Sequence, residues 1–313
     1  MRAALIRELE AAPGVGEVTA PEGEDVLEVL AAPLNPIDLA VSRGLHYLGH
    51  PPLPYVPGCE AVGRTAEGRV VWIFDGGLGI SRGGAMTERV SVGESSVVEL
   101  PGDADPVLAA ALGIAGLAGW LPLAWRAPLG GGETVLVLGA TGTVGLVAVQ
   151  TAKLLGAARV VAAGRSAEGL ERAASLGADA TVRLGENEDL VSAFREACGG
   201  DGPTFVFDVL WGAPAAAAVQ AAAPFATVVN LGQSAGPTSE LASGAVRGKN
   251  LTLLGHTNYL VPPAALAEHY RRLVGHAVAG EIRLELERVP LDDVGDAWRR
   301  QAEGAGTKLV LVP

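Results

Sequence analysis

A glycine-rich turn between an apolar run and a helical pattern offers the clearest chemistry in this 313-residue chain. Gly139, Gly142 and Gly145 lie in VLVLGATGTVGLVAVQTAKLLGA, residues 135–157. Glycine at the second place lets a backbone approach a pyrophosphate, and glycine at the third lets the helix pack closely on the strand. The first N–H groups of such a helix would face the phosphates. The strict G-x-G-x-x-G spacing is absent, and the alternative is a purely structural tight turn.

The end of the next predicted strand indicates which nucleotide such a turn would hold. A site specific for NAD places Asp or Glu there, about 20 residues further on, to bond the ribose 2′-hydroxyl. Here that place is Gly164, followed by Arg165 and Ser166. No carboxylate repels a 2′-phosphate, and a guanidinium can bind one. The pattern favours NADPH, and the alternative is a solvated arginine after a strand.

A parallel sheet must position these residues, and the sequence predicts one from about residue 133 onwards. Apolar runs of Val and Leu alternate there with helical patterns, which indicates strands covered by helices on both faces. Residues 1–110 consist of short extended segments punctuated by Gly and Pro, with one helix after Pro36. The expected strands are 134–138, 159–163, 204–210, 226–231 and 251–254; the expected helices are 144–155, 167–176 and 214–223, with a buried helix pair in 106–125 and a strand, helix and final strand in 284–313.

Composition restricts the partners and the location. The chain is 49% hydrophobic and 19% charged, which is globular composition. A net charge of −12 without a basic patch disfavours nucleic acid and anionic membranes. We find no apolar run long enough to span a membrane, no secretory signal, and only two cysteines. We therefore expect a cytoplasmic protein without a disulfide framework.

Eight segments, taken in order, resemble the medium-chain dehydrogenase/reductase (MDR) superfamily in its zinc-free quinone oxidoreductase-like branch. The resemblance covers essentially the whole chain and rests on the joint order of the segments. It implies an α/β fold with a GroES-like, β-rich catalytic domain over 1–112, completed by 282–313. A doubly wound Rossmann domain that binds NADPH would occupy 113–281, with the active site in the cleft. The segments are PLNPIDLAVSRG (33–44), VPGCEAVG (56–63), GGAMTERVSV (83–92), ALGIAGLAGW (111–120), 135–157, LGAD (176–179), FVFDVL (205–210) and VVNLGQSAG (228–236).

The resemblance also shows where the chain departs from zinc-dependent members of the superfamily. Their Cys, His and Cys ligand places match Asn35, Cys59 and Ile114 here. One thiol beside an amide and an aliphatic side chain cannot make a three-ligand catalytic zinc site. We therefore expect no metal, and we interpret Glu60 as a buried charge or a cleft-lining residue and not as a ligand.

Without a metal, the resemblance implies hydride transfer from NADPH to a quinone or to the activated C=C of an enone. The protein would then supply orientation and a hydrogen-bond donor for the developing oxyanion. Tyr47 and Tyr55 lie in the segment that lines the family's substrate cleft, which makes them the candidate catalytic donors. Either tyrosine could instead be a packing residue.

Cofactor contacts follow from the turn and from the resemblance together. Asn35 matches a position near the nicotinamide ribose, and 228–233 and 253–258 match two strand ends beside the nicotinamide. His256 could face the cleft or belong to its loop, and we favour the loop; Asp208 is interpreted as structural. The expected cofactor-binding residues are Asn35, Thr141, Gly142, Thr143, Val144, Gly164, Arg165, Ser166, Asn230, Gly232, Gln233 and Gly255.

Two other functions stay open at this point. An enoyl-thioester reductase needs cations for a phosphopantetheine or coenzyme A arm, and the N-terminal part offers few beyond Arg43, Arg64 and Arg82. A non-enzymatic NADPH-binding protein would keep the cofactor site without turnover.

The resemblance also has an implication for assembly. Family members dimerise through a last Rossmann strand that matches residues 250–257, so we expect a homodimer.

Overall fold

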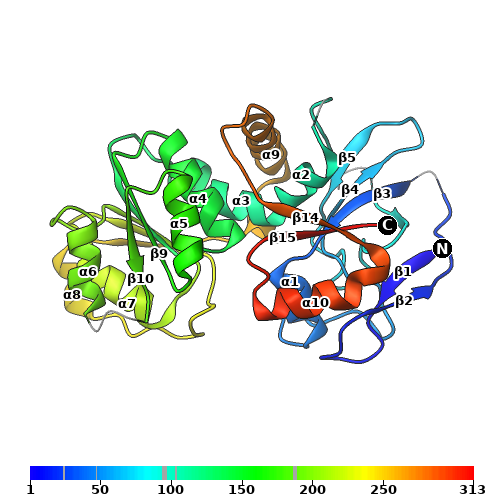
Figure 1. Ribbon diagram of the computed structural model, residues 1–313, viewed down its shortest axis with the longest axis horizontal. Coiled ribbons are helices and arrows are strands. Elements are labelled where there is room, and N and C mark those ends of the chain that lie inside the picture. Colours follow the sequence, from blue (N-terminus) through cyan, green and yellow to red (C-terminus); the bar gives the residue numbers. More distant parts are fainter. Residues whose placement is uncertain (24, 47, 94–96, 103, 186–188) are drawn as a thin grey trace. The chain divides into compact units, whose positions relative to one another are not determined.

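The computed structural model describes residues 1–23, 25–46, 48–93, 97–102, 104–185 and 189–313, and the chain divides into two compact units (Figure 1). Unit 1 comprises Met1–Ala115, Pro263–Val278 and Leu284–Pro313. Unit 2 comprises Gly116–Pro262 and Ala279–Arg283. No described helix is both long enough and apolar enough to cross a membrane.

Unit 2 contains a six-stranded parallel sheet with the order β10-β9-β8-β11-β12-β13. Successive strands move outward from β8 to β10, and the chain then restarts on the other side of β8 at β11. Sheets of this kind bind ligands beyond the carboxyl ends of the strands where the order reverses. The strands are β8 (Thr134–Leu138), β9 (Arg159–Gly164), β10 (Ala180–Arg183), β11 (Phe205–Asp208), β12 (Thr227–Asn230) and β13 (Thr252–Gly255).

Helices cover both faces of this sheet because side chains alternate along its central strands. Val135 and Val137 of β8 enter one buried cluster with residues of α4, whereas Leu136 and Leu138 enter a second with residues of α6 and α7. β10 and α6 are not among the elements expected from the sequence. The helices are α3 (Ile114–Leu121, beginning in unit 1), α4 (Thr143–Leu154), α5 (Ala167–Ser175), α6 (Leu190–Ala197), α7 (Gly212–Ala221) and α8 (Ser243–Gly248).

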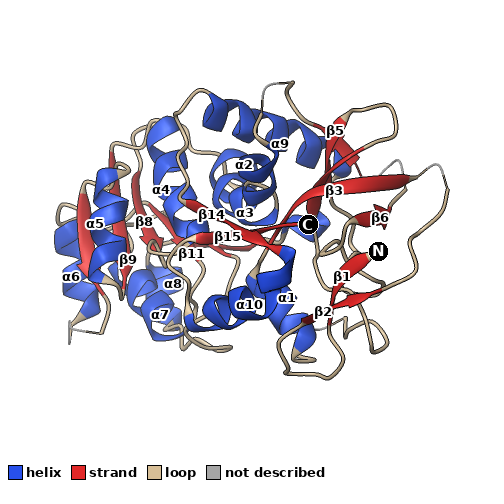
Figure 2. Cartoon of the chain, turned by 45° about the vertical axis from the view of Figure 1, so that its right-hand side comes forward, coloured by secondary structure: helices blue, strands red, loops and turns tan. Residues whose placement is uncertain are grey.

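Unit 1 contains a seven-stranded sheet in which strands from the two ends of the chain pair. The order is β14-β15-β3-β4-β5-β7, and β6 pairs with β3. The C-terminal β15 pairs antiparallel with β3, and Figure 2 shows these strands in red. The elements are β1 (Arg2–Leu5), β2 (Gly14–Glu17), β3 (Val26–Pro33), α1 (Pro36–Ser42), β4 (Ala61–Arg64), β5 (Val70–Ile73), β6 (Arg89–Ser91), β7 (Val97–Glu99), α2 (Pro106–Ala111), α9 (Pro263–Val278), β14 (Leu286–Pro290), α10 (Val294–Glu303) and β15 (Lys308–Val312).

Helix α9 lies in unit 1, although the Rossmann domain expected over 113–281 includes its residues. Tyr270 of α9 explains this placement, because its side chain is fully buried in unit 1. Its ring stacks on Trp72 with centroids 4.3 Å apart, and its hydroxyl donates to the carbonyl oxygen of Ala109 at 2.9 Å. Aromatic stacking and a satisfied buried hydroxyl fix the helix there.

Candidate functional site

The turn after β8 presents an open stretch of main chain at Gly142. This residue is the N-cap of α4, so the N–H groups of Thr143 and Val144 begin a helix and have no acceptor within it. A Cβ built on Gly142 would meet nothing nearer than the carbonyl oxygen of Gly139, 3.9 Å away. Gly142 is also exposed. Free space beside unpaired helical N–H groups fits a pyrophosphate.

The other two glycines of the turn are required by packing. A Cβ on Gly145 would overlap the carbonyl oxygen of Gly139, because helix α4 lies so close to the end of β8. Gly139 has a φ of +80°, and a Cβ there would overlap the side chain of Val209 in the loop after β11. The purely structural interpretation therefore explains Gly139 and Gly145, and only Gly142 leaves room for a ligand.

Gly164, at the end of β9, is fixed by its neighbour Thr141. A Cβ on Gly164 would overlap the Thr141 methyl group, and a Cβ on Gly169 would lie 2.6 Å from the Thr141 Cβ. No carboxylate-bearing side chain fits at 164 while Thr141 keeps this position. The choice between NAD and NADP therefore depends on the residues that follow.

Two residues with guanidinium groups lie next to Gly164: Arg165 follows it in the chain, and Arg183 ends the neighbouring strand β10. Arg165 is exposed, and its carbonyl oxygen accepts a hydrogen bond from Nε of Arg183 at 3.3 Å. Arg183 ends β10 and pairs in register with Gly164. Ser166 is the N-cap of α5, and its Oγ accepts from the N–H of Gly169 at 3.1 Å. Arg183 is not among the residues expected from the sequence, because the sequence pattern does not predict β10.

Asn230, at the end of β12, uses its side chain to hold neighbouring loops. Its Nδ2 donates to Oδ2 of the buried Asp208 at 2.8 Å and to the carbonyl oxygen of Gly232 at 2.8 Å. Burial raises the pKa of Asp208, whose Oδ1 accepts from the N–H groups of Leu210 and Trp211. A Cβ on Gly232 would lie 2.5 Å from the oxygen of Val209. Asn230 and Gly232 thus shape the strand ends, and Asp208 has the structural role expected for it.

The end of β13 adds Gly255, whose carbonyl oxygen accepts from Nε of Arg126 at 3.1 Å. His256 bonds within its own loop, since its Nε2 lies 3.1 Å from Oδ1 of Asn258. Burial lowers the pKa of His256, so the ring is neutral at pH 7. Gln233, after β12, is exposed and is available to a ligand.

In unit 1 the places that match the zinc ligands are occupied by a buried polar network around Glu60. Asn35, Glu60 and Lys308 are at most 3% exposed. Nδ2 of Asn35 donates to Oε1 of Glu60 at 2.8 Å, and Oδ1 of Asn35 accepts from Nζ of Lys308 at 2.6 Å. The amide thus connects a carboxylate to an ammonium group. Because Asn35 is buried and bonded on both sides, its side chain is not free for the nicotinamide ribose in this structure.

Glu60 also receives two further N–H donors, from Nε1 of Trp72 and from the backbone of Ile114, both at 2.7 Å and both to its Oε2. A Cβ on Gly113 would overlap that oxygen, so the glycine before α3 makes room for it. The carboxylate therefore bridges two of the three matched ligand places, Asn35 and Ile114. Glu60 is a buried charge, one of the two interpretations left open by the sequence.

Burial dominates the electrostatics of this network. It raises the pKa of Glu60 to about 7, offset in part by the charge of Lys308 and by the N–H donors. Burial likewise lowers the pKa of Lys308 to about 8. Asp38, which accepts from the N–H groups of Asn35 at 2.7 Å and Cys59 at 3.0 Å, also has a raised pKa because it is buried. Two carboxylates and one ammonium group thus share a site that is closed to water.

Tyr55 lies near this network with a hydroxyl that meets no described partner. The residue is 5% exposed, and its oxygen is buried without a hydrogen bond. Burial, with Asp38 and Cys59 adding to the effect, raises the pKa of Tyr55 to about 12, so the phenol keeps its proton at neutral pH. A buried unpaired donor is costly unless a ligand or water satisfies it. Tyr47 lies outside the described residues.

The sequence signal for this network was weak. Lys308 is a single charged residue at the start of the apolar strand KLVLV, which by itself suggests a solvated strand end. Its partner Asn35 is 273 positions away in the chain. Only the pairing of β15 with β3 brings these residues together.

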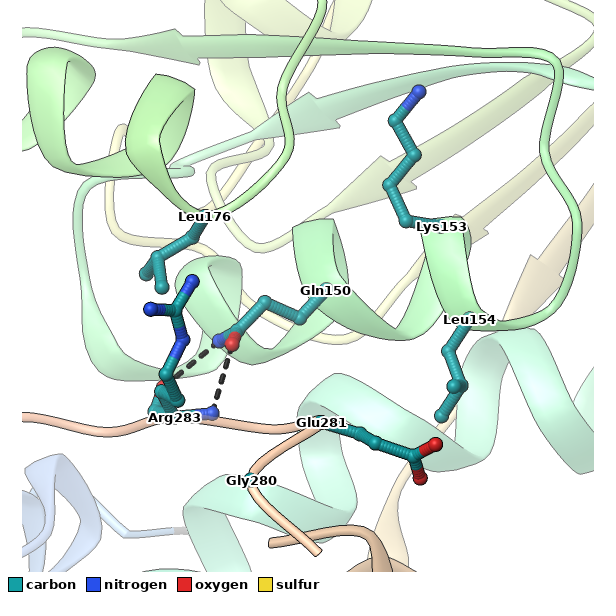
Figure 3. A pocket seen from close by; sticks show the side chains of 7 residues that line it. All are labelled: Gln150, Lys153, Leu154, Leu176, Gly280, Glu281 and Arg283. Carbon is teal, nitrogen blue, oxygen red and sulfur yellow. Dashed lines mark hydrogen bonds between the residues drawn. The ribbon is translucent and has the colours of Figure 1, made fainter.

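A cavity of about 400 Å³ in unit 2 is separate from all of these residues (Figure 3). Gln150 of α4 lines it and bonds the backbone of Arg283 at 2.8 and 2.9 Å. Lys153, one turn further on, forms an ion pair with Asp179 at 2.6 Å. The polar side chains of Gln150 and Lys153 are therefore engaged with the protein itself, and the cavity is not a candidate for the cofactor.

Comparison with known proteins relates both units to one family. A family model described as zinc-binding dehydrogenase matches residues 143–274. Quinone oxidoreductase-like protein 2 of Mus musculus is 30% identical over 261 residues, which cover 81% of this chain and 74% of that protein. The chain belongs to the quinone oxidoreductase-like branch of the MDR superfamily.

Two further similarities extend over more of the chain. A polyketide synthase subunit of Mycobacterium tuberculosis is 30% identical over 93% of this chain, which corresponds to 14% of that longer protein. The crystal structure of Escherichia coli quinone oxidoreductase complexed with NADPH superimposes with a TM-score of 0.86, covers 100% of both chains and is 23% identical. The fold is thus the two-part MDR fold, with a mixed sheet in unit 1 and a parallel sheet in unit 2.

The donor set of this MDR chain does not fit the zinc that the matched family model names. Ile114 carries no donor atom in its side chain, and the Asn35 amide is held by Glu60 and Lys308. Burial raises the pKa of the Cys59 thiol well above its ordinary value, which disfavours the thiolate that binds metal. Among the described residues, no group of three or more His, Cys, Asp or Glu could hold a metal ion. Metal independence stays a prediction.

Proposed function

We propose that this protein is an NADPH-dependent oxidoreductase that reduces a quinone or the activated C=C of an enone. The observation that carries the proposal is the open main chain at Gly142, in a chain that belongs to the quinone oxidoreductase-like family. Bound NADPH supplies a hydride to the acceptor. The residues of this chain would bind the cofactor, orient the acceptor and provide a hydrogen-bond donor for its carbonyl oxygen.

Unit 2 would hold the cofactor through main chain and two guanidinium groups. The N–H groups that follow Gly142 face a pyrophosphate, since the first turn of α4 leaves them unpaired. Arg165 and Arg183 would bind the 2′-phosphate, because a guanidinium pairs with phosphate in a charge-assisted hydrogen bond. The relative solved with NADPH shares this fold and is consistent with that choice.

Tyr55 would donate to the carbonyl oxygen of the acceptor. Hydride addition at the β-carbon of an enone moves an electron pair toward that oxygen, and a donor placed there stabilises the resulting enolate. The Tyr55 phenol keeps its proton at neutral pH, since its pKa is raised to about 12. Water can then protonate the α-carbon. No strong Lewis acid is expected here, so the acceptor must already be electron-poor.

An enoyl-thioester reductase is the second candidate, and the match to a segment of a polyketide synthase subunit favours it. We rank it lower because the N-terminal part has few cations for a phosphate-bearing arm.

A homodimer joined through β13 also belongs to the proposal, because β13 is an edge strand and Leu253 on it is 41% exposed. A mass of 31.7 kDa by light scattering at micromolar concentration would contradict the dimer.

The experiment that tests the function is NADPH oxidation with three groups of acceptors: quinones, enones and enoyl thioesters. We expect turnover with quinones or enones, unchanged after dialysis against a chelator. Turnover confined to thioesters would move the assignment to the second candidate. NADPH binding without turnover of any acceptor would make the protein a non-enzymatic NADPH-binding protein. Stoichiometric zinc, lost together with activity, would contradict metal independence.

A further inference from the structure

One buried carboxylate connects two strand ends of unit 2. Asp208 ends β11 and pairs in register with Asn230, which ends the neighbouring strand β12. Oδ2 of Asp208 accepts from Nδ2 of Asn230 at 2.8 Å. Its Oδ1 accepts from the N–H groups of Leu210 and Trp211 at 2.8 and 3.0 Å. Asp208 is fully buried, and these side-chain bonds are not part of the sheet ladder. They therefore act on the two loops that follow the strands.

The loop after β11 has a backbone conformation that its sequence disfavours. Trp211 has a φ of +56° and a ψ of −155°, a combination that is sterically costly for any residue except glycine. Its N–H group and that of Leu210 are held by the same oxygen of Asp208. Strain of this kind persists only where the surrounding contacts fix it, and it is concentrated at functional sites. The loop that Asp208 holds is therefore a candidate for a functional role.

The loop after β12 is bonded to the loop after β11. The N–H and Oγ of Ser234 both donate to the carbonyl oxygen of Val209, at 3.3 and 3.1 Å. A Cβ on Gly232 would lie 2.5 Å from the same oxygen, so the two loops are in close contact. Nδ2 of Asn230 also donates to the carbonyl oxygen of Gly232 at 2.8 Å. The shape of the second loop thus follows that of the first, which Asp208 fixes.

The loop after β11 also contacts the glycine turn. The side chain of Val209 occupies the space that a Cβ on Gly139 would need. In the sheet, β11 lies between β8, which precedes the turn, and β12. Asp208 therefore connects the turn that we expect to hold the pyrophosphate with the strand end that matches a position beside the nicotinamide. A cofactor bound at both places would have its two ends aligned through this one side chain.

We propose that Asp208 is a positioning residue for hydride transfer: through the loop after β12 it holds the nicotinamide of bound NADPH in one orientation relative to the pyrophosphate. The proposal rests on the proposed function and adds a residue to it. Asp208 touches neither the cofactor nor the acceptor and acts through Asn230 and the main chain of Gly232. Orientation of this kind matters because a displacement of about 1 Å can lower a rate about a hundredfold.

Asp208→Asn tests the proposal by replacing one oxygen. The amide keeps an acceptor for the N–H groups of Leu210 and Trp211, but its NH₂ group then faces Nδ2 of Asn230, so two donors meet. We expect kcat for NADPH oxidation to fall about tenfold to a hundredfold. The fluorescence anisotropy of bound NADPH should also fall, because its emission comes from the nicotinamide. The affinity for 2′,5′-ADP, which lacks the nicotinamide, should stay unchanged by calorimetry.

A second variant releases the same loop from the other strand. Asn230→Ala removes the bonds to Asp208 and Gly232 and should cause the same losses. The matched control is Asp179→Asn. Asp179 also accepts from a backbone N–H, that of Val160 at 2.7 Å, but it precedes β10 and so lies at the amino end of the sheet. This control should lower the melting temperature and leave kcat and the anisotropy of bound NADPH at the wild-type values.

The outcomes are distinct. If Asp208→Asn and Asn230→Ala lose only thermal stability and keep kcat and the anisotropy, Asp208 is a structural residue and the proposal is overturned. Equal losses of kcat and anisotropy in Asp179→Asn would overturn it too, because they would follow from lower stability alone. A wild type that binds NADPH but reduces no acceptor would overturn the proposed activity, and the anisotropy would still decide whether Asp208 orients the nicotinamide. A wild type that binds neither NADPH nor 2′,5′-ADP would overturn both.

Discussion

The turn at the start of α4 leaves polar groups of the main chain open to a ligand, whereas the network around Glu60 pairs its polar side chains with one another. The turn uses main chain and empty space: glycines at 139 and 145 permit close packing, and Gly142 leaves the helical N–H groups open. The network uses side chains from distant segments, and each polar atom already has a partner within the protein. The turn is therefore sensitive to added atoms and the network to removed ones. This difference determines which substitution should break each region.

The largest expected effect is at the turn. Gly142→Val should abolish NADPH binding while the fold survives, because its Cβ meets no protein atom within 3.9 Å but lies where the pyrophosphate is expected. The matched variant is Gly145→Val, whose Cβ overlaps the Gly139 carbonyl and should unfold unit 2. NADPH titration by fluorescence and thermal melting measure the two outcomes. Normal binding by Gly142→Val would mean that all three glycines serve the turn alone.

The network should respond to the loss of a single charge. Lys308→Met leaves Glu60 and Asp38 buried without the ammonium group that is bonded to Asn35, and breaking a buried ionic group of this kind costs about 3–5 kcal/mol. Urea unfolding measures it. Adding Glu60→Gln to Lys308→Met should restore part of the stability, since it removes one uncompensated charge. If the double variant is less stable than Lys308→Met, the two groups do not compensate each other.

The same comparison explains what could be predicted from the sequence. The turn and its flanking elements are local, so the expected strand 134–138 coincides with β8 and the expected helix 144–155 is displaced from α4 by one residue at each end. The strand β10 was not predicted because Val182 is its only buried residue, which is too little for a strand pattern. Without β10, the sequence gives no reason to place Arg183 beside Gly164.

The orientation of Asn35 and the reason for a glycine at 164 depend on tertiary contacts. Asn35 was assigned to the cofactor because its position matched the family, but its orientation depends on Lys308, a residue far along the chain. From the sequence, Gly164 was significant only because no carboxylate stands at that position. The structure shows that close packing against Thr141 requires a glycine there. Local pattern predicts elements, and it cannot assign partners to side chains that only the folded chain brings together.

Tyr55 lies near the network, and its buried hydroxyl has no hydrogen-bond partner among the residues that the structure describes. Tyr55→Phe should lower kcat about 10²- to 10³-fold, the loss typical of one oxyanion donor, without changing NADPH affinity. Protein stability should stay equal or rise, since an unsatisfied hydroxyl is removed. Steady-state kinetics and melting on the same preparations test both. A loss of stability with unchanged kcat would make Tyr55 a packing residue.

A smaller effect is expected where side chains supplement the main-chain turn. Arg165→Ala should weaken NADPH binding by roughly tenfold to a hundredfold, since a charge-assisted hydrogen bond contributes about 1.5–3 kcal/mol. NADH binding should change little, because NADH lacks the 2′-phosphate. Arg183→Ala should show the same selectivity if the two guanidinium groups share that phosphate. Equal losses for both nucleotides, or a wild-type preference for NADH, would remove Arg165 from this role.

The smallest effect concerns the pH dependence of the network. Burial raises the pKa of Glu60 from an ordinary 4.5 to about 7, so the folded protein binds this proton more tightly than the unfolded chain. The stabilisation is fully present below pH 4.5 and is lost as the pH rises through about 7, by at most about 1.4 kcal/mol per pH unit. Lys308, whose pKa is lowered from 10.5 to about 8, acts at higher pH and in the opposite sense: its contribution is present above 10.5 and is lost as the pH falls through about 8.

The free energy of unfolding of the wild type relative to Glu60→Gln should therefore fall between pH 5 and pH 7, as measured by urea unfolding at three pH values. Glu240→Gln, which changes an exposed carboxylate outside the network, is the control and should leave the wild-type pH dependence in place. A difference between wild type and Glu60→Gln that is constant over this range would show that Glu60 does not titrate there. In that case the N–H donors from Asn35, Trp72 and Ile114 outweigh burial and keep the carboxylate ionised.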